Sequence, residues 1–319
     1  MTIARKQQID LTITPYYHCV SRCVRRSFLC GKDPVTNQSY EHRRHWIEQR
    51  IHQLAHIYCI DICSYSVMSN HYHLVVHINK EKAEKLTDLE VVERWSAEHK
   101  IDPLITQFKH GLPMDKHALR ACMKVVELWR ERLSSLSWMM KELNMSIALM
   151  ANREDKCTGH FWEGRFRSHA LLDETALLAA MAYVDLNPVR AGIEVTPEQS
   201  KYTSIKLRVT SLKEQVQTPT ALCPFKTSQK GELTHAIPYN LRDYLELVNW
   251  IAKYQTKTDS VTLDSNLPDI FSRLDAQVMD FLNTSTQLEQ KGYLWIGSQE
   301  KLSNAKRSMN KKRLLGLAV

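Results

Sequence analysis

The feature that most constrains this chain is a β-hairpin signature at Cys63–Asn79, CSYSVMSNHYHLVVHIN. Two apolar, β-prone runs flank a short turn at residues 68–70, which predicts two antiparallel strands. Alternate residues of a strand share a face, so His71 and His73 should project from one side while Tyr72 points into the core. Two imidazoles at this spacing form half of a divalent-cation site, or they are a pair of surface histidines. This stretch alone favours neither.

The composition describes an ordinary globular chain with a basic balance. A formal net charge of +8 and a pI near 9.0 favour a polyanionic partner, with nucleic acid first. At 319 residues, one large or two modest domains are expected. The eight cysteines are scattered, so we expect buried small hydrophobic residues in preference to a zinc site. We expect no signal peptide and no membrane span, and therefore a cytoplasmic location.

The order of the predicted elements places the hairpin in a split β-α-β arrangement. A strand is predicted at residues 16–22, followed by the basic pair Arg25 and Arg26, and an amphipathic helix at residues 40–58. Strand, helix and two strands form the first half of this arrangement. Residues 80–133 are charged and helix-prone, and we interpret them as a helical insertion. A second amphipathic helix is predicted at residues 134–152.

The segment 159–172, GHFWEGRFRSHALL, combines cations with aromatic residues. Its tail predicts a strand with three basic side chains on one face, namely Arg165, Arg167 and His169. Phe161 and Trp162 lie just upstream. Cations interleaved with aromatic rings suit phosphate contacts and base stacking. The alternative is a solvated edge strand, and the net charge favours nucleic acid.

A helix that Asp173 caps is predicted to run to about Leu186, before Pro188. Its buried stripe is expected to consist of Leu177, Leu178, Met181 and Val184. Tyr183 falls outside this stripe, on a face with Ala176, Ala179 and Ala180, and Asn187 lies one turn further on. We therefore expect an exposed phenol beside an amide, although a tyrosine at the edge of the core is the plainer alternative.

These pieces fit one reaction. A divalent ion held by His71 and His73 would polarise a phosphodiester, and the phenolic oxygen of Tyr183 would attack it. Asn187 could be the third ligand if its helix crosses the sheet face. A phosphotyrosine link conserves the bond energy, so the same site could rejoin strands without a nucleotide cofactor.

Two segments of the chain carry a family resemblance. The run SVMSNHYHLVVHI resembles the HUH motif (histidine, hydrophobic residue, histidine) of single-tyrosine transposases of the insertion-sequence-200 type. The run GHFWEGRFRSHALLDETALLAAMAYVDLNPVRAGI is similar to the nucleophile-bearing segment of their REP-associated branch (RAYT). The resemblance implies that His71, His73 and Asn187 bind Mg²⁺ or Mn²⁺ and that Tyr183 is the nucleophile. Tyr72 departs from the motif, because an aliphatic residue usually stands there.

The resemblance also implies a fold and a substrate. The expected fold is α+β, a ferredoxin-like HUH endonuclease domain with an antiparallel sheet, the helical insertion and a mostly α-helical C-terminal extension. The expected activity is transposase-type nicking and rejoining of single-stranded DNA near hairpins through a 5′-phosphotyrosine. The residues expected to contact DNA are Arg22, Arg25, Arg26, Arg165, Arg167, His169 and Arg190. No further cofactor is expected, and an active site shared within a homodimer is left open.

The predicted organisation divides the chain in three. Residues 1–209 form the HUH domain, residues 210–235 a linker, and residues 236–319 a basic helical region that could bind DNA, with helices near 240–255 and 270–283. Association with the nucleoid follows from the proposed substrate. Two alternatives remain: a DNA-binding regulator derived from such an enzyme without cleavage, and a phosphodiesterase that uses water.

Overall fold

The structure is a computed structural model that describes residues 8–24, 29–33, 37–216, 221–226, 236–256, 267–274, 277–289 and 292–319. Among these residues, six strands form one sheet in the order β2-β3-β1-β4-β5-β6. Their bounds are β1 Tyr16–Arg22, β2 Ile60–Val67, β3 His71–Ile78, β4 Arg167–Leu171, β5 Trp295–Gly297 and β6 Gly316–Ala318. The first four strands pair antiparallel, and β5 and β6 extend the sheet in parallel.

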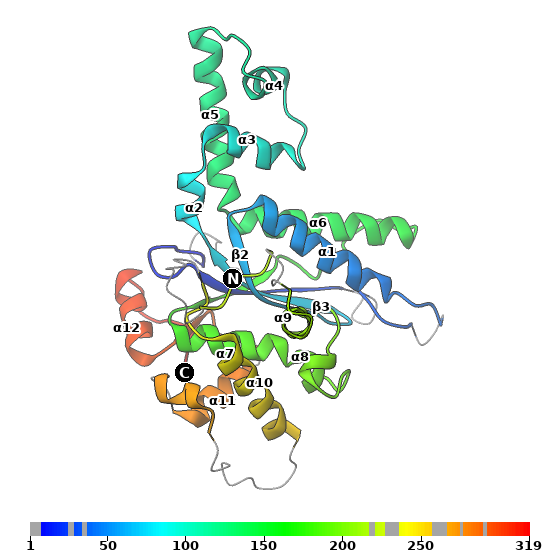
Figure 1. The fold of residues 1–319 in the computed structure, drawn as a ribbon, viewed down its shortest axis with the longest axis vertical. Coiled ribbons are helices and arrows are strands. Elements are labelled where there is room, and N and C mark those ends of the chain that lie inside the picture. The colour runs from blue at the N-terminus through cyan, green and yellow to red at the C-terminus, as the bar shows by residue number, and fades with distance from the viewer. Residues whose placement is uncertain are drawn as a thin grey trace.

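The prediction of an α+β fold with a split β-α-β arrangement is confirmed. The chain runs β1, α1 (His42–Ile57), β2, β3, α6 (Leu136–Glu154), β4, and the strand order 2-3-1-4 is that of a ferredoxin-like sheet. Helices α1 and α6 lie on one face of the sheet (Figure 1). The predicted first strand agrees with β1, and both predicted amphipathic helices agree to within two residues at each end.

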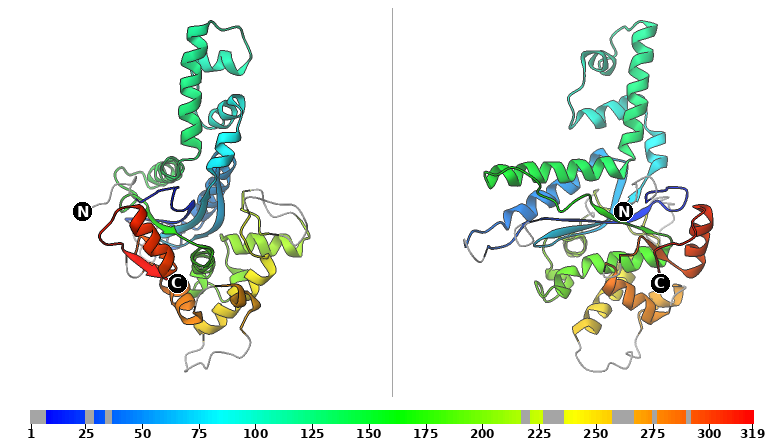
Figure 2. Two further views of the ribbon diagram at one scale, coloured as in Figure 1. Left: turned by 90° about the vertical axis from the view of Figure 1, so that its left-hand side faces the viewer. Right: turned by 180° about the vertical axis from the view of Figure 1, so that it is seen from behind.

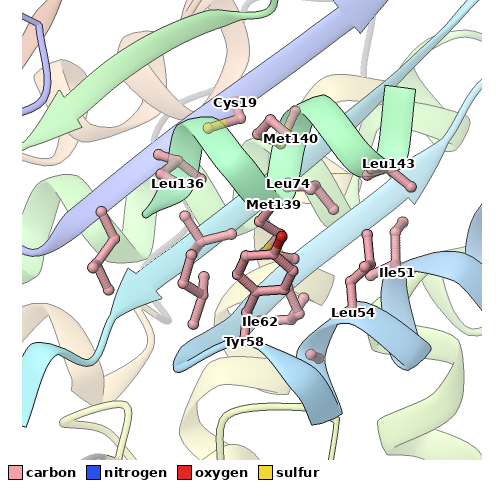
Figure 3. Close-up of a cluster of buried hydrophobic side chains, with 14 of the residues drawn as sticks. Cys19, Ile51, Leu54, Tyr58, Ile62, Leu74, Leu136, Met139, Met140 and Leu143 are labelled. Atoms are coloured by element: carbon pink, nitrogen blue, oxygen red, sulfur yellow. The ribbon is translucent and has the colours of Figure 1, made fainter. Parts of the chain in front are cut away.

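The face under α1 and α6 is the apolar core of the first domain. Strand parity sends Cys19, Tyr72 and Leu74 to this face, and all three are fully buried. Figure 3 shows Cys19 and Leu74 among side chains of α1 and α6, including Ile51, Leu54, Met139 and Leu143. Burial of such side chains stabilises each by roughly 1.5–3 kcal/mol relative to exposure. One face of β3 therefore packs into the core. His71 and His73, which alternate with the core residues, lie on the opposite face.

The other face of the sheet is covered by α7 (Glu174–Asp185). Helix α11 (Val278–Gln287) packs against α7 from the side away from the sheet, and α10 (Leu241–Thr256) belongs to the same layer (Figure 1). Short helices α8 (Asn187–Arg190) and α9 (Ser204–Lys213) complete it, together with 3-10 turns at Pro197–Gln199 and Asp269–Arg273. Helix α7 is thus enclosed between a sheet and a second helical layer.

The predicted insertion is helical and projects from the body of the molecule (Figures 1 and 2). It contains α2 (Lys80–Lys85), α3 (Asp88–Ser96), α4 (Pro103–Lys109) and α5 (Lys116–Leu133). Pro103 begins α4 at a position where its missing N–H has no intrahelical partner to lose. A stacked pair of tryptophan rings, Trp95 and Trp129, joins α3 to α5.

The C-terminal region shares the sheet of the N-terminal domain. Its strands β5 and β6 continue the sheet beyond β4, with α12 (Gln299–Ser308) between them in sequence. Within the predicted linker, the Cys223 N–H donates to the Ile62 carbonyl of β2. The region is therefore mixed in structure. The predicted helix near 240–255 corresponds to α10, whereas the one near 270–283 overlaps α11 only from Val278 onward, and Asp269–Arg273 is a 3-10 helix. The domain boundaries themselves stay a prediction.

Two simpler expectations concern the whole chain. Of the eight cysteines, Cys157 is half-buried and the others are buried. No described helix is both long enough and apolar enough to cross a membrane.

Candidate active site

His71 and His73 lie side by side on β3, as the hairpin pattern predicts. Their ring centroids are 4.6 Å apart and the rings are nearly perpendicular. The ring of His71 contacts the Asn70 side chain through Nδ1. Tyr72, between them, is on the opposite face and its hydroxyl donates to Asn144 Oδ1. The aromatic residue in the motif is therefore a core residue, away from the histidine face.

Tyr183 faces these histidines from α7. The helix begins where Asp173 Oδ1 accepts from the Ala176 N–H at 2.8 Å, as the predicted cap requires. The centroid of the Tyr183 ring lies 5.7 Å from that of His73, edge-on. The expectation of an exposed phenol is wrong, since Tyr183 is only 8% exposed. The cause is α11, which covers α7 and leaves every residue from Thr175 to Asp185 buried.

Asn187 lies at the junction where α7 ends and α8 begins. Its side-chain amide is 2.6 Å from His73 Nε2, so a residue on a helix and a residue on the sheet meet directly. The predicted neighbours Tyr183, Asn187, His71 and His73 are therefore gathered at one place. Asn187 is itself buried.

A third histidine, which the sequence analysis did not single out, continues the site. His18 on β1 places Nε2 3.0 Å from His73 Nδ1 and Nδ1 3.0 Å from His169 Nδ1. All three rings are buried and successive rings are nearly parallel. We call His169, His18 and His73 the histidine row. His169 thus lies inside the sheet-helix interface. The alternation of His18, Val20 and Arg22 on β1 was the available signal, but only the strand pairing places His18 beside His73.

Glu289 is the second residue that the sequence did not reveal. It follows α11, and its Oε1 lies 3.1 Å from His73 Nδ1 while its Oε2 lies 3.7 Å from Arg22 Nη2. No motif marks Glu289, because it is separated from the site residues by a hundred residues or more of chain. The ligand atoms of His18, His73 and Glu289 all lie within 4.8 Å of one another.

Burial and neighbouring charges set the ionisation of the site. Burial lowers the pKa of His71 to about 2 and that of His169 to about 4, and it lowers the pKa of His18 well below its ordinary value. Burial alone would raise the pKa of Glu289, but His73 and the other histidines reverse this and hold it well below the usual range. His18, His71 and His169 are therefore held as neutral imidazoles, and the Glu289 carboxyl is held in its ionised form.

The pKa of the Tyr183 phenol is shifted upward, in the opposite direction to the pKa values of the histidines. Burial, with a contribution from Glu289, raises its pKa to about 12, and Arg190 opposes this shift. The Arg190 guanidinium carbon lies 4.0 Å from the centroid of the Tyr183 ring, and Nη2 donates to the Tyr183 carbonyl at 3.2 Å. A cation stacked on the ring stabilises the phenolate form, which is the form that would attack phosphorus.

The predicted DNA-contacting arginines fall into three groups. Arg22, Arg165 and Arg167 line one cavity of about 180 Å³, together with Glu163 and Glu289. Arg190 stacks on Tyr183. Arg25 and Arg26 lie outside the described residues. Three guanidinium groups around a cavity of this size suit a phosphate group.

The aromatic residues of the segment 159–172 contribute more to packing of the fold than expected. Phe161 is buried in the core, and the Trp162 indole N–H donates to the Asn144 carbonyl at 2.8 Å. Beside them, a larger hollow of about 730 Å³ is lined by Phe161, Trp162, Phe166, Lys141 and Arg165 among others. Gly164 and Arg165 line both this hollow and the arginine cavity. The aromatic hollow and the cavity lined by the arginines are thus continuous.

The site fits a divalent cation by its donor chemistry. His73 Nε2 and the Asn187 amide are 2.6 Å apart, near the roughly 3 Å separation of adjacent ligands around an ion with bonds of about 2.1 Å. The amide presents either nitrogen or oxygen after a half-turn. In addition, Glu289 Oε1 is buried and has no well-aligned hydrogen bond among the described residues. Two imidazoles and an amide oxygen suit Mn²⁺, and the oxygen donors of a phosphate and water would also suit Mg²⁺.

Comparison with known proteins gives one structural similarity. No family model matches the sequence, and no curated protein matches it. Among solved structures, the chain is similar to a REP-associated tyrosine transposase bound to a REP hairpin. The sequence identity is 11% and the TM-score 0.39, over 74% of this chain and 97% of that one. At this identity and TM-score the similarity says nothing of the function, which is inferred from the geometry of the site alone.

Proposed function

We propose that this protein is a metal-dependent strand transferase of single-stranded DNA, of the tyrosine transposase type, in which Tyr183 is the nucleophile. One observation carries the proposal. Tyr183 and Asn187, one helical turn apart, both meet His73, at a ring-centroid distance of 5.7 Å and an atom distance of 2.6 Å respectively. A potential nucleophile and a potential metal-binding set thus share one point of the fold.

The chemistry follows from these positions. The phenolic oxygen of Tyr183 attacks phosphorus, and a bond forms between them. The bond from phosphorus to the 3′-oxygen breaks, and that oxygen leaves with the electron pair and takes up a proton as a free 3′-OH. The phenolic proton passes to water. When bound at His71, His73 and Asn187, Mg²⁺ or Mn²⁺ would stabilise charge on the non-bridging oxygens.

The surrounding residues have separate tasks in this proposal. Arg190 stabilises the developing phenolate through the contact with the ring of Tyr183. Arg22, Arg165 and Arg167 bind a neighbouring phosphate in their shared cavity. Rejoining is the reverse attack, in which a 3′-OH displaces the tyrosine oxygen from phosphorus. His169, which is buried in the histidine row, is better assigned to orientation of that row than to DNA.

The deciding experiment is capture of the covalent intermediate. The full-length protein is incubated with Mn²⁺ and a library of hairpin-flanked single strands, and denaturing electrophoresis separates any protein–DNA adduct. We expect an adduct with the wild type and none with Tyr183→Phe. Tyr72→Phe is the matched control, because Tyr72 is the motif's own tyrosine but faces the core, and this variant should still form the adduct.

Two other results would redirect the assignment. Cleavage that survives Tyr183→Phe would indicate a phosphodiesterase that uses water. Salt-sensitive binding without cleavage, unchanged by EDTA, would indicate a DNA-binding regulator that keeps the fold. The cluster of Tyr183, His73, His71 and Asn187 favours the enzyme, because a regulator has no use for a metal-binding set beside a buried phenol.

A further inference from the structure

The histidine row has a restricted set of proton arrangements. A neutral imidazole carries one N–H and one lone pair, so each nitrogen–nitrogen contact needs a donor on one ring and an acceptor on the other. His18 uses both of its nitrogens, with Nδ1 3.0 Å from His169 and Nε2 3.0 Å from His73. When His73 carries a single proton, as a metal-binding imidazole must, the three rings have two consistent arrangements, with opposite directions of donation.

The two arrangements differ at the atom that matters for a metal. In the first, His73 Nδ1–H donates to His18, His18 Nδ1–H donates to His169, and His73 Nε2 keeps its lone pair. In the second, donation runs from His169 to His18 to His73, and the proton of His73 is on Nε2. Only the first leaves Nε2 as a ligand beside Asn187, 2.6 Å away. Metal binding requires an unprotonated nitrogen.

Glu289 distinguishes the two arrangements. A carboxylate accepts hydrogen bonds and donates none, and its Oε1 lies 3.1 Å from His73 Nδ1. In the first arrangement this oxygen lies beside a protonated nitrogen, which attracts it although the N–H points to His18, whereas in the second it lies beside a lone pair and is repelled. Arg22, at 3.7 Å from Oε2, holds the carboxylate from its other side. The carboxylate thus lies on the Nδ1 side of His73, and Asn187 lies on the Nε2 side.

We propose that Glu289 is a positioning residue that fixes the proton of His73 on Nδ1 and thereby keeps Nε2 available to the cation. The use of the cation in this inference rests on the proposed function. The position of the His73 proton, however, is a property of the metal-free protein. It gives the C-terminal region a defined task at a site whose other residues come from the first 190 positions of the chain. Carboxylate partners of this kind typically change metal affinity by about 10–100-fold.

The test reads the tautomer directly. The full-length protein is labelled with ¹⁵N-histidine, the metal-free protein is studied by long-range ¹H–¹⁵N correlation, and His73 is assigned by comparison with His73→Gln. We expect Nδ1–H at His73 in the wild type and a shift toward Nε2–H in Glu289→Gln. Glu163→Gln is the matched control, because Glu163 lines the same cavity from an exposed position and should leave His73 unchanged. Glu289→Asp, which keeps the charge, should restore part of the Nδ1–H population and guards against misfolding of the Gln variant.

Mn²⁺ affinity, measured by calorimetry, supplies the second readout. We expect Glu289→Gln to weaken binding about tenfold, with less change in Glu163→Gln. An unchanged tautomer in Glu289→Gln would overturn the proposal; if Mn²⁺ binding were then lost entirely, Glu289 would be a direct ligand. Conversely, a tautomer shift in a protein that forms no DNA adduct would support this inference while contradicting the proposed function.

Discussion

His73 Nε2 and the side-chain amide of Asn187 lie 2.6 Å apart across the interface between sheet and helix, although 114 positions separate them in the sequence. On its other side, His73 meets His18 and Glu289 through Nδ1. His73 is therefore the point at which the hairpin, the first strand, the α7–α8 segment and the C-terminal region all make contact. A change in the position of any of these elements should therefore alter the contacts of the His73 ring.

Arg190 should be required for the chemical step. Removal of its guanidinium group takes away the cation that opposes the raised pKa of Tyr183, about 12, and the developing phenolate loses its stacked partner. We expect Arg190→Ala to slow adduct formation about 100-fold in single-turnover assays at saturating DNA. Arg190→Lys should be intermediate, because it keeps the charge without the planar contact. Arg153→Ala, at an exposed position near the end of α6, is the control and should react at the wild-type rate.

The arginine cavity should contribute to DNA affinity without regard to sequence. Arg165→Ala and Arg167→Ala each remove one cation from the cavity and should weaken binding to several unrelated single strands alike. The slope of log affinity against log salt concentration should fall by about 0.7 for each phosphate that the variant no longer neutralises. Fluorescence anisotropy across a salt series measures this. Arg120→Ala on the projecting helix α5 is the matched control, and an equal decrease in slope there would assign the effect to overall charge.

Asp61 should stabilise the sheet in a pH-dependent way. Burial would raise its pKa, but hydrogen bonds and charge from His77, with Lys82 and Asn79, lower it below its ordinary value. A carboxyl group whose pKa is lower in the folded state stabilises that state above its unfolded pKa, near 4, and this contribution disappears as the pH falls.

Asp61→Asn should accordingly lower the free energy of unfolding by about 1 kcal/mol at pH 7 and by much less at pH 3. Urea unfolding of both proteins at the two pH values measures the difference. Glu131→Gln, on the exposed side of α5, provides the comparison and should show little change at either pH. A difference between wild type and Asp61→Asn that is independent of pH would rule out the ionic explanation.

Much of the fold follows from local sequence patterns. Alternation around His71 and His73 predicts both the hairpin and the face on which these residues lie, since Tyr72 and Leu74 must be buried on the other. Asp173 and the helical period place α7 and bring Tyr183 and Asn187 to one site. These features depend on residues that are only a few positions apart in the sequence. Hydrophobic periodicity and helix-capping residues reveal interactions over such short separations.

The remaining features depend on segments that are distant in sequence. Tyr183 is buried because α11 covers α7, and nothing in the sequence of α7 reveals that partner. His18 reaches His73 only through the pairing register of β1 with β3, in which Val20 is opposite His73. Glu289 joins the site from beyond α11 without a motif of its own. Periodicity describes one element at a time, and these contacts exist only between elements.

The pairing of β5 with β4 has a consequence for the order in which the protein matures. During synthesis, the first four strands and the helix of Tyr183 leave the ribosome well before Glu289 and β5 do. A nascent chain can therefore form the hairpin and the helix that carries Tyr183 while Glu289 and strand β5 have not yet been synthesised. Glu289 therefore reaches His73 only after all three members of the histidine row have been synthesised.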